Sequence, residues 1–425
     1  MMRKYAFFTA FGLALSLGLT ACGGSSQSTT DNTSGNTQTT TVASGPITAF
    51  GSIFVNGVEY NTDNASIYME GKPADESQLR VGMMVRVLEN ANGHAQSVHF
   101  DDELEGIVLA NNISAGQTAG TMDIMGQTVT ITAQTVFESQ VATISDVSQI
   151  VAGNIVEVSG FSDNNGTIVA TRIEVKAVDL SSYLAIHPEG IELKGTVANH
   201  DSSTKTFTIG NLTISYAGAV LQDLPDGIAN DMYVEVHSIE GIDQNNQLVA
   251  SKVELKNDDS MGRHDDGDEN DEYKFHGMIM EVTADSILVN NHTILITDET
   301  EYENGNRDNL QVGVMVDVEA YINDANELVA REVKFAEQHN NVELQGVIAA
   351  IDATGTNEGT ITLEDGTVII VTTGTIMDDD RDEGNMPNQH FNLSDLSQGD
   401  YIEVHAYDNG DGTYTAVKIE RDDQP

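Results

Sequence analysis

One motif recurs five times along this chain and limits the folds that the chain can adopt. Each copy opens with Gly-x-(Ile/Val), continues to a Gly-x-x-(Val/Ile)-x-Val segment and closes with Ala-x-x-(Val/Ile). The central segments begin 71 to 86 residues apart, so the repeated unit has the size of a small domain and not of one solenoid turn. The opening glycines are Gly45, Gly106, Gly195, Gly277 and Gly346, and the central segments begin at Gly82, Gly153, Asp231, Gly313 and Gly399.

Between the opening and the central segment, each copy carries two apolar-rich runs separated by turn residues. Such residues tolerate the positive φ of a two-residue hairpin, so the runs are predicted to form a β-hairpin. A stretch led by Asp or Ser then predicts a single helical turn, because an N-cap residue precedes an apolar one. The turns are Asn56-Gly57, Gly126-Gln127, Gly210-Asn211, Asn290-Asn291 and Asp365-Gly366, and the helical stretches begin at Ser145, Asp223, Asp308 and Ser394.

The order of elements in each copy is therefore strand, hairpin, helical turn, strand and strand. This order predicts an all-β fold: a tandem array of about five small five-stranded barrels of the oligonucleotide/oligosaccharide-binding (OB) type. An open five-stranded sheet or a small sandwich is the alternative that the pattern leaves.

The N-terminus has the pattern of a secretory signal. Arg3 and Lys4 precede an apolar run from Tyr5 to Leu19, which is shorter than the roughly 20 residues that a membrane-spanning helix needs. The run ends in Leu19-Thr20-Ala21-Cys22, which resembles the lipobox of bacterial lipoproteins. Cys22 is the one cysteine in the sequence. We predict that it is lipidated and anchors the protein in a lipid bilayer, although an ordinary signal peptide could carry it incidentally.

Together, the lipobox, the Gly-x-(Ile/Val) openings, the Gly-x-x-Val-Glu-Val strands and the Ala-x-x-(Val/Ile) endings resemble tandem copies of the bacterial domain of unknown function 5666. The resemblance covers about residues 45 to 421. It implies a surface lipoprotein built of OB-like modules. The family has no established activity, so no catalytic residue can be transferred from it.

The chain is thus predicted to carry its barrels after a signal peptide and a flexible linker. Residues 23–44 consist mostly of Ser, Thr, Asn, Gln and Gly, and cannot bury a core. Gly23 follows Cys22 where an Asp would favour retention at the inner membrane, so the outer membrane is the predicted location. The predicted segments are a lipoprotein signal peptide (1–21), a disordered tether (22–44), OB-like repeats at 45–101, 103–178, 190–257, 273–337 and 342–422, and an acidic linker (258–272).

The chain is strongly acidic, with 67 Asp and Glu against 19 Lys and Arg and a formal net charge of −48. Nucleic-acid binding depends on Lys and Arg contacts to phosphates, so nucleic acid is not a predicted partner. Mutual repulsion also favours a monomer. The remaining candidate partners are envelope proteins, surface polymers and divalent cations.

Metal binding has weak candidates in this sequence. The acidic runs do not have the spacing of an EF-hand loop. His264, Asp265, Asp266 and Asp268 combine imidazole with carboxylates, which are suitable transition-metal ligands, but an exposed histidine in the acidic linker is the simpler interpretation.

Acidic residues also recur inside the fourth strand of the repeat. Strand alternation points these side chains away from the barrel core, so they are predicted to be exposed. His237 and His405 follow the same strand in two repeats and are also predicted to face mostly solvent. The recurring acids are Glu157, Glu235, Asp317 and Glu403.

The sequence shows no pattern of an enzyme active site. It contains no Gly-x-Ser-x-Gly elbow and no phosphate-binding glycine loop, and lipidation would consume its one thiol. We therefore predict a non-enzymatic envelope lipoprotein without a cofactor, whose OB-like modules bind or scaffold. The alternative is a surface protein that binds divalent cations or small cationic ligands.

Overall fold

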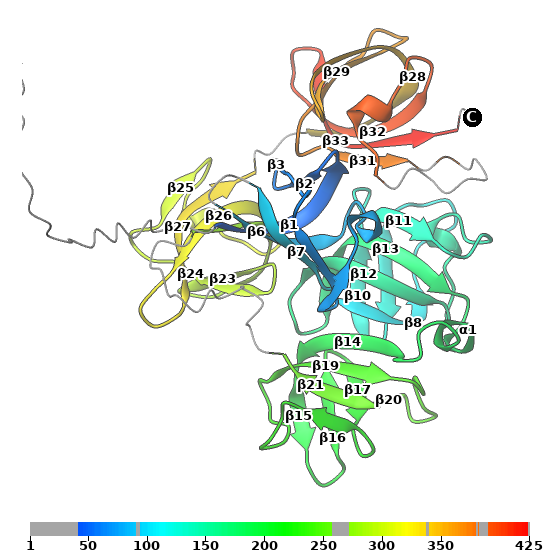
Figure 1. Ribbon diagram of the computed structural model, residues 1–425, viewed down its shortest axis with the longest axis vertical. Coiled ribbons are helices and arrows are strands. Elements are labelled where there is room, and N and C mark those ends of the chain that lie inside the picture. Colours follow the sequence, from blue (N-terminus) through cyan, green and yellow to red (C-terminus); the bar gives the residue numbers. More distant parts are fainter. Residues whose placement is uncertain are drawn as a thin grey trace, which may run out of the picture. The chain divides into compact units, whose positions relative to one another are not determined.

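In a computed structural model of the chain, the residues that are described are 41–90, 94–256, 272–336, 340–379, 381 and 390–423. They form an all-β structure with a few short helices (Figure 1). Cys22, the signal peptide and the metal candidates His264, Asp265, Asp266 and Asp268 lie outside the described residues. Within the described ranges, no helix is both long and apolar enough to cross a membrane.

The fifth repeat illustrates the common architecture. Its strands are β28 (Asn340–Gly355), β29 (Glu358–Leu363), β30 (Val368–Val371), β31 (Ile376–Asp379), β32 (Tyr401–Asp408) and β33 (Thr413–Asp422), with the 3-10 helix η5 (Leu393–Asp395) before β32. Antiparallel pairs join β28 to β29, β29 to β30, β32 to β33 and β28 to β32, and β30 pairs with β33 in parallel. The sheet therefore closes in the order β28-β29-β30-β33-β32, which confirms the predicted OB-type barrel.

The second and fourth repeats close through the same pairings. The second consists of β8 (Leu104–Asn111), β9 (Gly120–Ile124), β10 (Gln127–Ile131), β11 (Val136–Ser139), η2 (Val147–Gln149), β12 (Ile155–Ser162) and β13 (Thr167–Ala177). The fourth consists of β22 (Glu272–Val282), β23 (Ser286–Val289), β24 (His292–Leu295), β25 (Glu301–Glu303), η4 (Arg307–Asn309), β26 (Met315–Ile322) and β27 (Leu328–Phe335).

The first and third repeats are variants of this barrel. The first has β1 (Thr41–Phe50), β2 (Ile53–Val55), β3 (Val58–Tyr60), β4 (Ser66–Met69), β5 (Lys72–Ala74), η1 (Glu76–Gln78), β6 (Met84–Glu89) and β7 (Ala95–Phe100), and one parallel bridge between Asn61 and His94 links its third and last strands. The third has β14 (Ile191–Thr196), β15 (Ala198–Asp201), β16 (Thr206–Ile209), β17 (Leu212–Ser215), β18 (Val220–Gln222), β19 (Tyr233–Ser238), β20 (Gln247–Val249) and β21 (Lys252–Leu255). A short helix, α1 (Leu180–Leu184), precedes it.

The start of the first repeat differs from the prediction. Thr41–Ser44, assigned from the sequence to the tether, form the first part of β1 and pair in parallel with Glu272–Phe275 of β22. Val42 and Ala43 are the reason, because Val42 is buried in the core of the fourth repeat and Ala43 in that of the first. The predicted tether therefore extends four residues too far.

The recurring glycines have two different structural causes. At the opening glycines the hairpin packs against the backbone: a Cβ on Gly45 would lie 2.0 Å from Asn56 Oδ1, and one on Gly277 would lie 2.1 Å from Asn290 Oδ1. The glycines of the central segments instead have positive φ, between +84° and +99°. Asp231, the one departure from glycine, has the same kind of conformation with φ of 69°, which aspartate tolerates better than most residues.

The closing alanine also has a structural partner in three repeats. A buried threonine hydroxyl donates to its carbonyl oxygen, at 2.8 to 3.0 Å. This bond ties the extra strand before the helical turn to the last strand of the barrel. The pairs are Thr135 with Ala170, Thr300 with Ala330 and Thr375 with Ala416.

The predicted helical turns near Ser145, Asp308 and Ser394 are confirmed as η2, η4 and η5. The turn predicted at Asp223 is wrong, since residues 223–230 contain no helix. Asp223 has φ of 56°, and Pro225 disfavours the helical conformation of the residue before it.

Candidate functional site

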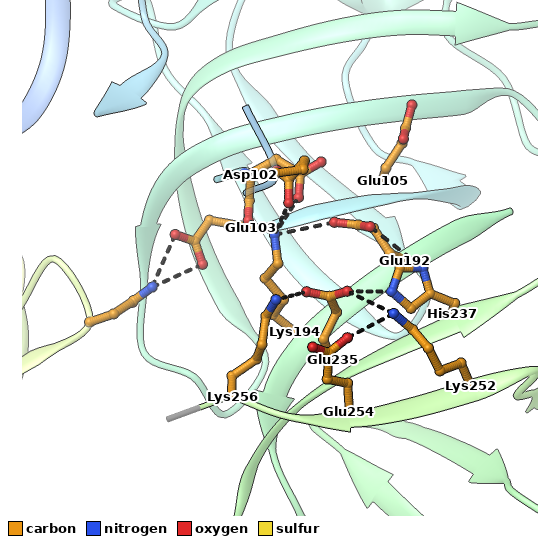
Figure 2. Close-up of polar contacts among 12 residues, drawn as sticks. Asp102, Glu103, Glu105, Glu192, Lys194, Glu235, His237, Lys252, Glu254 and Lys256 are labelled. Carbon is orange, nitrogen blue, oxygen red and sulfur yellow. Dashed lines mark hydrogen bonds and ion pairs between the residues drawn. The ribbon is translucent and has the colours of Figure 1, made fainter. Parts of the chain in front are cut away.

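A cluster of buried charged side chains lies on the outer faces of β14 and β19 of the third repeat (Figure 2). In this antiparallel pair Glu192 lies opposite His237, and Lys194 lies opposite Glu235. The four residues alternate with the core residues Leu193 and Val236, so all four project from the same side of the sheet. We call Glu192, Lys194, Glu235 and His237, with Glu70 and Asp102, the β14–β19 charge cluster.

Lys194 is the centre of this cluster. Its Nζ lies 3.1 Å from Glu70 Oε2, 3.0 Å from Asp102 Oδ1 and 3.2 Å from Glu192 Oε1. Glu70 belongs to the first repeat and Asp102 to the connection between the first and second repeats, so one lysine joins three parts of the chain. Its side chain is only 6% exposed, and although burial opposes its charge, the three carboxyl groups raise the pKa of Lys194 well above its usual value.

The carboxyl groups around Lys194 respond differently to burial. Burial raises the pKa of Glu70 to about 7 and the pKa of Asp102 well above its usual range, and Lys194 only partly counteracts this. For Glu192 burial is again the largest effect and raises the pKa, but Lys194, the hydrogen bond with Asp102 and His237 together outweigh it, and the pKa is lowered. Glu192 is therefore the ionised partner of Lys194, while the other two retain protons more readily.

Further acids surround the cluster on β8 and before it. Burial raises the pKa of Glu103 to about 7 and that of Glu105 to about 8. Glu105 accepts a hydrogen bond from the hydroxyl of Tyr183 on α1 and lies opposite Glu192 where β8 pairs with β14. The region thus has more carboxyl groups than ammonium groups, and its excess negative charge favours bound protons or a cation.

His237 occupies the other end of the cluster. Its Nε2 is hydrogen-bonded to the carboxylate of Glu235, and its Nδ1 lies 3.6 Å from Glu192 Oε2 without a hydrogen-bond partner. Lys256 Nζ lies 2.5 Å from Glu235 Oε2, and Lys252 Nζ lies 4.0 Å from Glu235 Oε1. Although burial acts to raise it, the hydrogen bond from His237 and the lysines hold the pKa of Glu235 well below its usual value.

The predicted exposure of this strand position is wrong for the third repeat. Glu235 is 4% exposed and His237 is 9% exposed. The side chains do point away from the barrel, as alternation predicts, but Glu70 of the first repeat, Asp102 of the connection and β8 of the second repeat lie against that face. The prediction holds for Asp317 and Glu403, which are exposed, whereas Glu157 is partly buried and ion-paired with Lys176.

One of the acidic runs of the sequence is Asp378-Asp-Asp-Arg-Asp-Glu383, and its described acids Asp378 and Asp379 form ion pairs. Lys418 Nζ lies 3.4 Å from Asp378, and Arg421 Nη2 lies 2.6 Å from Asp379. Both cations come from β33, next to β31, where they pair with the acids across the parallel strands. These two aspartates therefore serve the fold of the fifth repeat.

Three groups of residues among those described bring ligand atoms within 4.8 Å of one another and could hold a metal ion. They are Glu192 with Glu235 and His237, Glu70 with Asp102 and Glu192, and Asp102 with Glu105 and Glu157. Sequence reasoning missed all three, because their members come from strands, a turn and a connection that are separated in sequence. The one local signal was Glu235-x-His237, two residues on the same face of a strand.

The strand pairings and the buried charges define the class of protein, a tandem OB-barrel protein in which polar outer faces join neighbouring repeats. The chain belongs to the family described as Domain of unknown function (DUF5666), whose model matches residues 42–94, 105–174, 194–254, 276–334 and 345–420. This confirms the resemblance of the five repeats to that domain, which was predicted from their motifs. No curated protein matches the chain. Among solved structures, drosophila Unr CSD456 is similar at 12% identity, over 54% of this chain and 95% of that chain, with a TM-score of 0.13.

Proposed function

We propose that the protein is a non-enzymatic lipoprotein of the cell envelope whose tandem OB-like repeats act as a scaffold for envelope proteins or surface polymers. The observation that carries this proposal is the position of Lys194, whose three carboxyl partners come from the first repeat, the next connection and the third repeat. Here the polar outer face of a barrel is used for contacts within the chain.

The differences among repeats support the same function. The glycines, core valines and closing alanines recur, and so does one outward acid of the fourth strand in four copies, whereas the residue before the opening glycine changes from Glu105 to Lys194, His276 and Gln345. A catalytic site present in every repeat would require the same set of outward-facing functional residues in every repeat. A scaffold needs only the barrel to recur, and gains different contacts from different outer faces.

The anchor is proposed from the sequence, since Cys22 follows a lipobox-like Leu-Thr-Ala. Stable anchoring needs more than one acyl chain. Several acyl chains attached to Cys22 would therefore hold the protein at the outer membrane. Cells supplied with a labelled fatty acid should incorporate the label into the wild-type protein and not into Cys22→Ser. The variant should also leave the membrane fraction; membrane retention without the label would contradict the proposed anchor.

The scaffold role can be tested by crosslinking in intact cells. Photo-crosslinking residues at Val220 and Val312, which are 64% and 63% exposed, would report contacts of the third and fourth repeats. We expect defined adducts with envelope proteins or polymers that disappear in Cys22→Ser. Recovery of lipids and abundant porins alone would contradict the contact-making role and leave the protein as a spacer.

The predicted alternative was a cation-binding surface protein. Its candidate residues from His264 to Asp268 lie outside the described part of the chain, so the structure gives them no role. The described residues offer instead the three groups named above, whose ligand atoms lie within 4.8 Å of one another.

A further inference from the structure

We propose that an exposed face of the third repeat binds a second copy of this chain, at an exposed turn of that copy's fourth repeat. The face, which we call the strand face, consists of Val220 on β18 with Ser251, Lys252 and Glu254 at and beside β21. The turn, which we call the glycine turn, is Leu310-Gln-Val-Gly313 before β26. The inference goes beyond the scaffold role and does not depend on the lipid anchor.

The second repeat packs on the first through an equivalent pair of surfaces. Val136 of β11 lies opposite Arg172 of β13 and belongs to the buried core of the first repeat. The Thr171 hydroxyl donates to the carbonyl oxygen of Gly82 at 2.7 Å, and Arg172 Nη1 donates to that of Val81 at 3.4 Å. This contact between repeats therefore joins one apolar side chain, one hydroxyl and one cation to a glycine turn.

The third repeat has the same groups at the same register positions. Its extra strand β18 pairs in parallel with its last strand β21, as β11 pairs with β13. In both repeats a valine lies opposite a cation, a hydroxyl residue precedes the cation, and a glutamate two residues later forms an ion pair with it. The residues are Val136, Thr171, Arg172 and Glu174 in the second repeat and Val220, Ser251, Lys252 and Glu254 in the third.

The strand face is buried in the second repeat and open in the third. Val136 and Arg172 are each 2% exposed, whereas Val220 is 64% exposed and the Lys252 side chain is 31% exposed. β18 is also the last strand of its sheet. An open apolar residue on such an edge strand favours association with another chain.

The fifth repeat uses its copy of the strand face for contacts as well. Ile376 lies opposite Lys418 and packs against the core of the first repeat. Lys418 Nζ donates to the carbonyl oxygen of Thr135 in the second repeat at 3.4 Å, and the residue is 2% exposed. Two of the three repeats with an apolar residue opposite a cation are thus covered here by another repeat. The first and fourth repeats lack the pair, because these positions are Ser66 with Ser97 and Glu301 with Glu332.

The fourth repeat has the matching glycine turn in an open form. Leu310-Gln-Val-Gly313 shares the pattern Leu-x-Val-Gly with Leu79-Arg-Val-Gly82, and the two glycines have φ of +89° and +84°. A Cβ on Gly82 would lie 2.9 Å from Arg172 Cβ, whereas one on Gly313 would meet no atom of the described residues within 4 Å. Val81 is 5% exposed under this contact, and Val312 is 63% exposed.

The sequence of the turn selects the fourth repeat as the binding partner. A valine directly precedes the glycine in the first and fourth repeats, and the first is already covered. The other repeats have different residues at this place, namely Ile150-Val-Ala-Gly153, Ile228-Ala-Asn-Asp231 and Leu396-Ser-Gln-Gly399.

The partner is a second copy because both surfaces are open in the same chain. A contact between them within one chain would bury Val220 and Val312, which are both exposed. Since the two surfaces differ, the contact between copies is heterologous and runs head to tail. The net charge of −48 opposes association, so the contact should strengthen with salt, which at about 1 M reduces the Debye length to about 3 Å.

The test is crosslinking between two differently tagged forms of the purified full chain, in the absence of envelope proteins. Both forms carry Cys22→Ser, so that the introduced thiols are the only ones. One form carries Val220→Cys and the other Val312→Cys, and a short bis-maleimide joins them at about 1 M salt. A short reagent suffices, because in the equivalent internal contact a Cβ on Gly82 would lie 3.2 Å from Val136 Cβ.

We expect a mixed dimer carrying both tags, with a yield several-fold above that of either like pair. Ile186→Cys is the matched control for Val220→Cys, because Ile186 is 75% exposed and lies outside the strand face. It should not link to Val312→Cys above the like pairs. A mixed dimer that is absent, or no more abundant than the like pairs or the control, would overturn the proposal.

Hydrogen exchange gives a second readout on the wild-type chain. Raising the protein concentration at about 1 M salt should slow exchange in peptides that contain β18 and residues 310–313, and leave β11 unchanged. Val312→Asp changes a residue that is already open to solvent, and it should abolish the protection of β18 in another repeat. Protection that is absent in the wild type, or that persists in β18 of Val312→Asp, would contradict the proposed contact.

Discussion

Replacing Lys194 with methionine should destabilise the third repeat far more than removing a nearby lysine that is only partly buried. Lys194→Met keeps most of the aliphatic volume and removes the ammonium that contacts Glu70, Asp102 and Glu192 at 3.0 to 3.2 Å. Breaking a buried ion pair by removing one partner costs about 3–5 kcal/mol. Lys252→Met is the matched control, because its side chain is 31% exposed and such pairs contribute about 0–1 kcal/mol.

The loss of unfolding free energy caused by Lys194→Met should depend on pH. In the wild type the pKa of Glu192 lies below its usual value of 4.5, so its contribution to stability is present above about pH 4.5 and is lost below that. In the variant without Lys194, burial remains and raises the pKa of Glu192. The variant therefore loses stability as pH rises from about 4.5, because the buried carboxyl group of Glu192 must then ionise. The difference between wild type and variant should therefore be smaller near pH 5 than near pH 8.

The assay is peptide-resolved hydrogen exchange in increasing urea, because the chain has no tryptophan and several repeats unfold in one sample. In Lys194→Met, amides of β14 and β19 should lose their protection from hydrogen exchange at a lower urea concentration than in the wild type. The corresponding shift in β28 and β32 should be smaller. Equal shifts for the two lysine variants would show that the cluster is not buried in solution. A cost that is the same at both pH values would refute the assigned ionisation of Glu192.

Three further substitutions test the repeat motif itself. Gly313→Ala should destabilise the fourth repeat by about 1–2 kcal/mol, since its φ is +89° and an added Cβ would meet no atom within 4 Å, so that urea unfolding measures backbone strain alone. Asp231→Gly should be neutral or stabilising by up to about 1 kcal/mol in the same assay, and a loss of stability would contradict the shared conformation. Thr375→Val should cost about 1–3 kcal/mol by leaving the carbonyl of Ala416 without its buried donor, and unchanged stability of the fifth repeat would argue against that bond.

The barrel could be predicted from the sequence because its determinants are local and repeated. The backbone has a positive φ at Gly82, Gly153, Gly313 and Gly399, so glycine recurs at the same position of four repeats. The hairpin turns and alternating valines have the same property, since their causes lie within a few residues. The error at Asp223 arose where a single proline two residues later overruled the local pattern.

The charge cluster could not be predicted in the same way. Alternation gives the side of the sheet on which Glu235 projects, but whether that side meets water depends on Glu70 and Asp102, more than a hundred residues away in sequence. Asp317 and Glu403 occupy the same position in the repeat and are exposed. Burial of an outward residue is therefore a property of the packing between repeats, which a single repeat does not encode.

Two histidines occupy the same position on the fourth strand of the third and fifth repeats. His237 and His405 have the same register, the same glutamate two residues earlier and a glutamate opposite. In the fifth repeat a glutamine, Gln345, stands in place of the lysine, and the acids are exposed; in the third, Lys194 contacts Glu70 of the first repeat and Asp102 of the connection that follows it. The same strand pattern is thus buried in the third repeat and open to solvent in the fifth. Specific chemistry in this family of repeats is accordingly expected where outward residues differ and another repeat covers them.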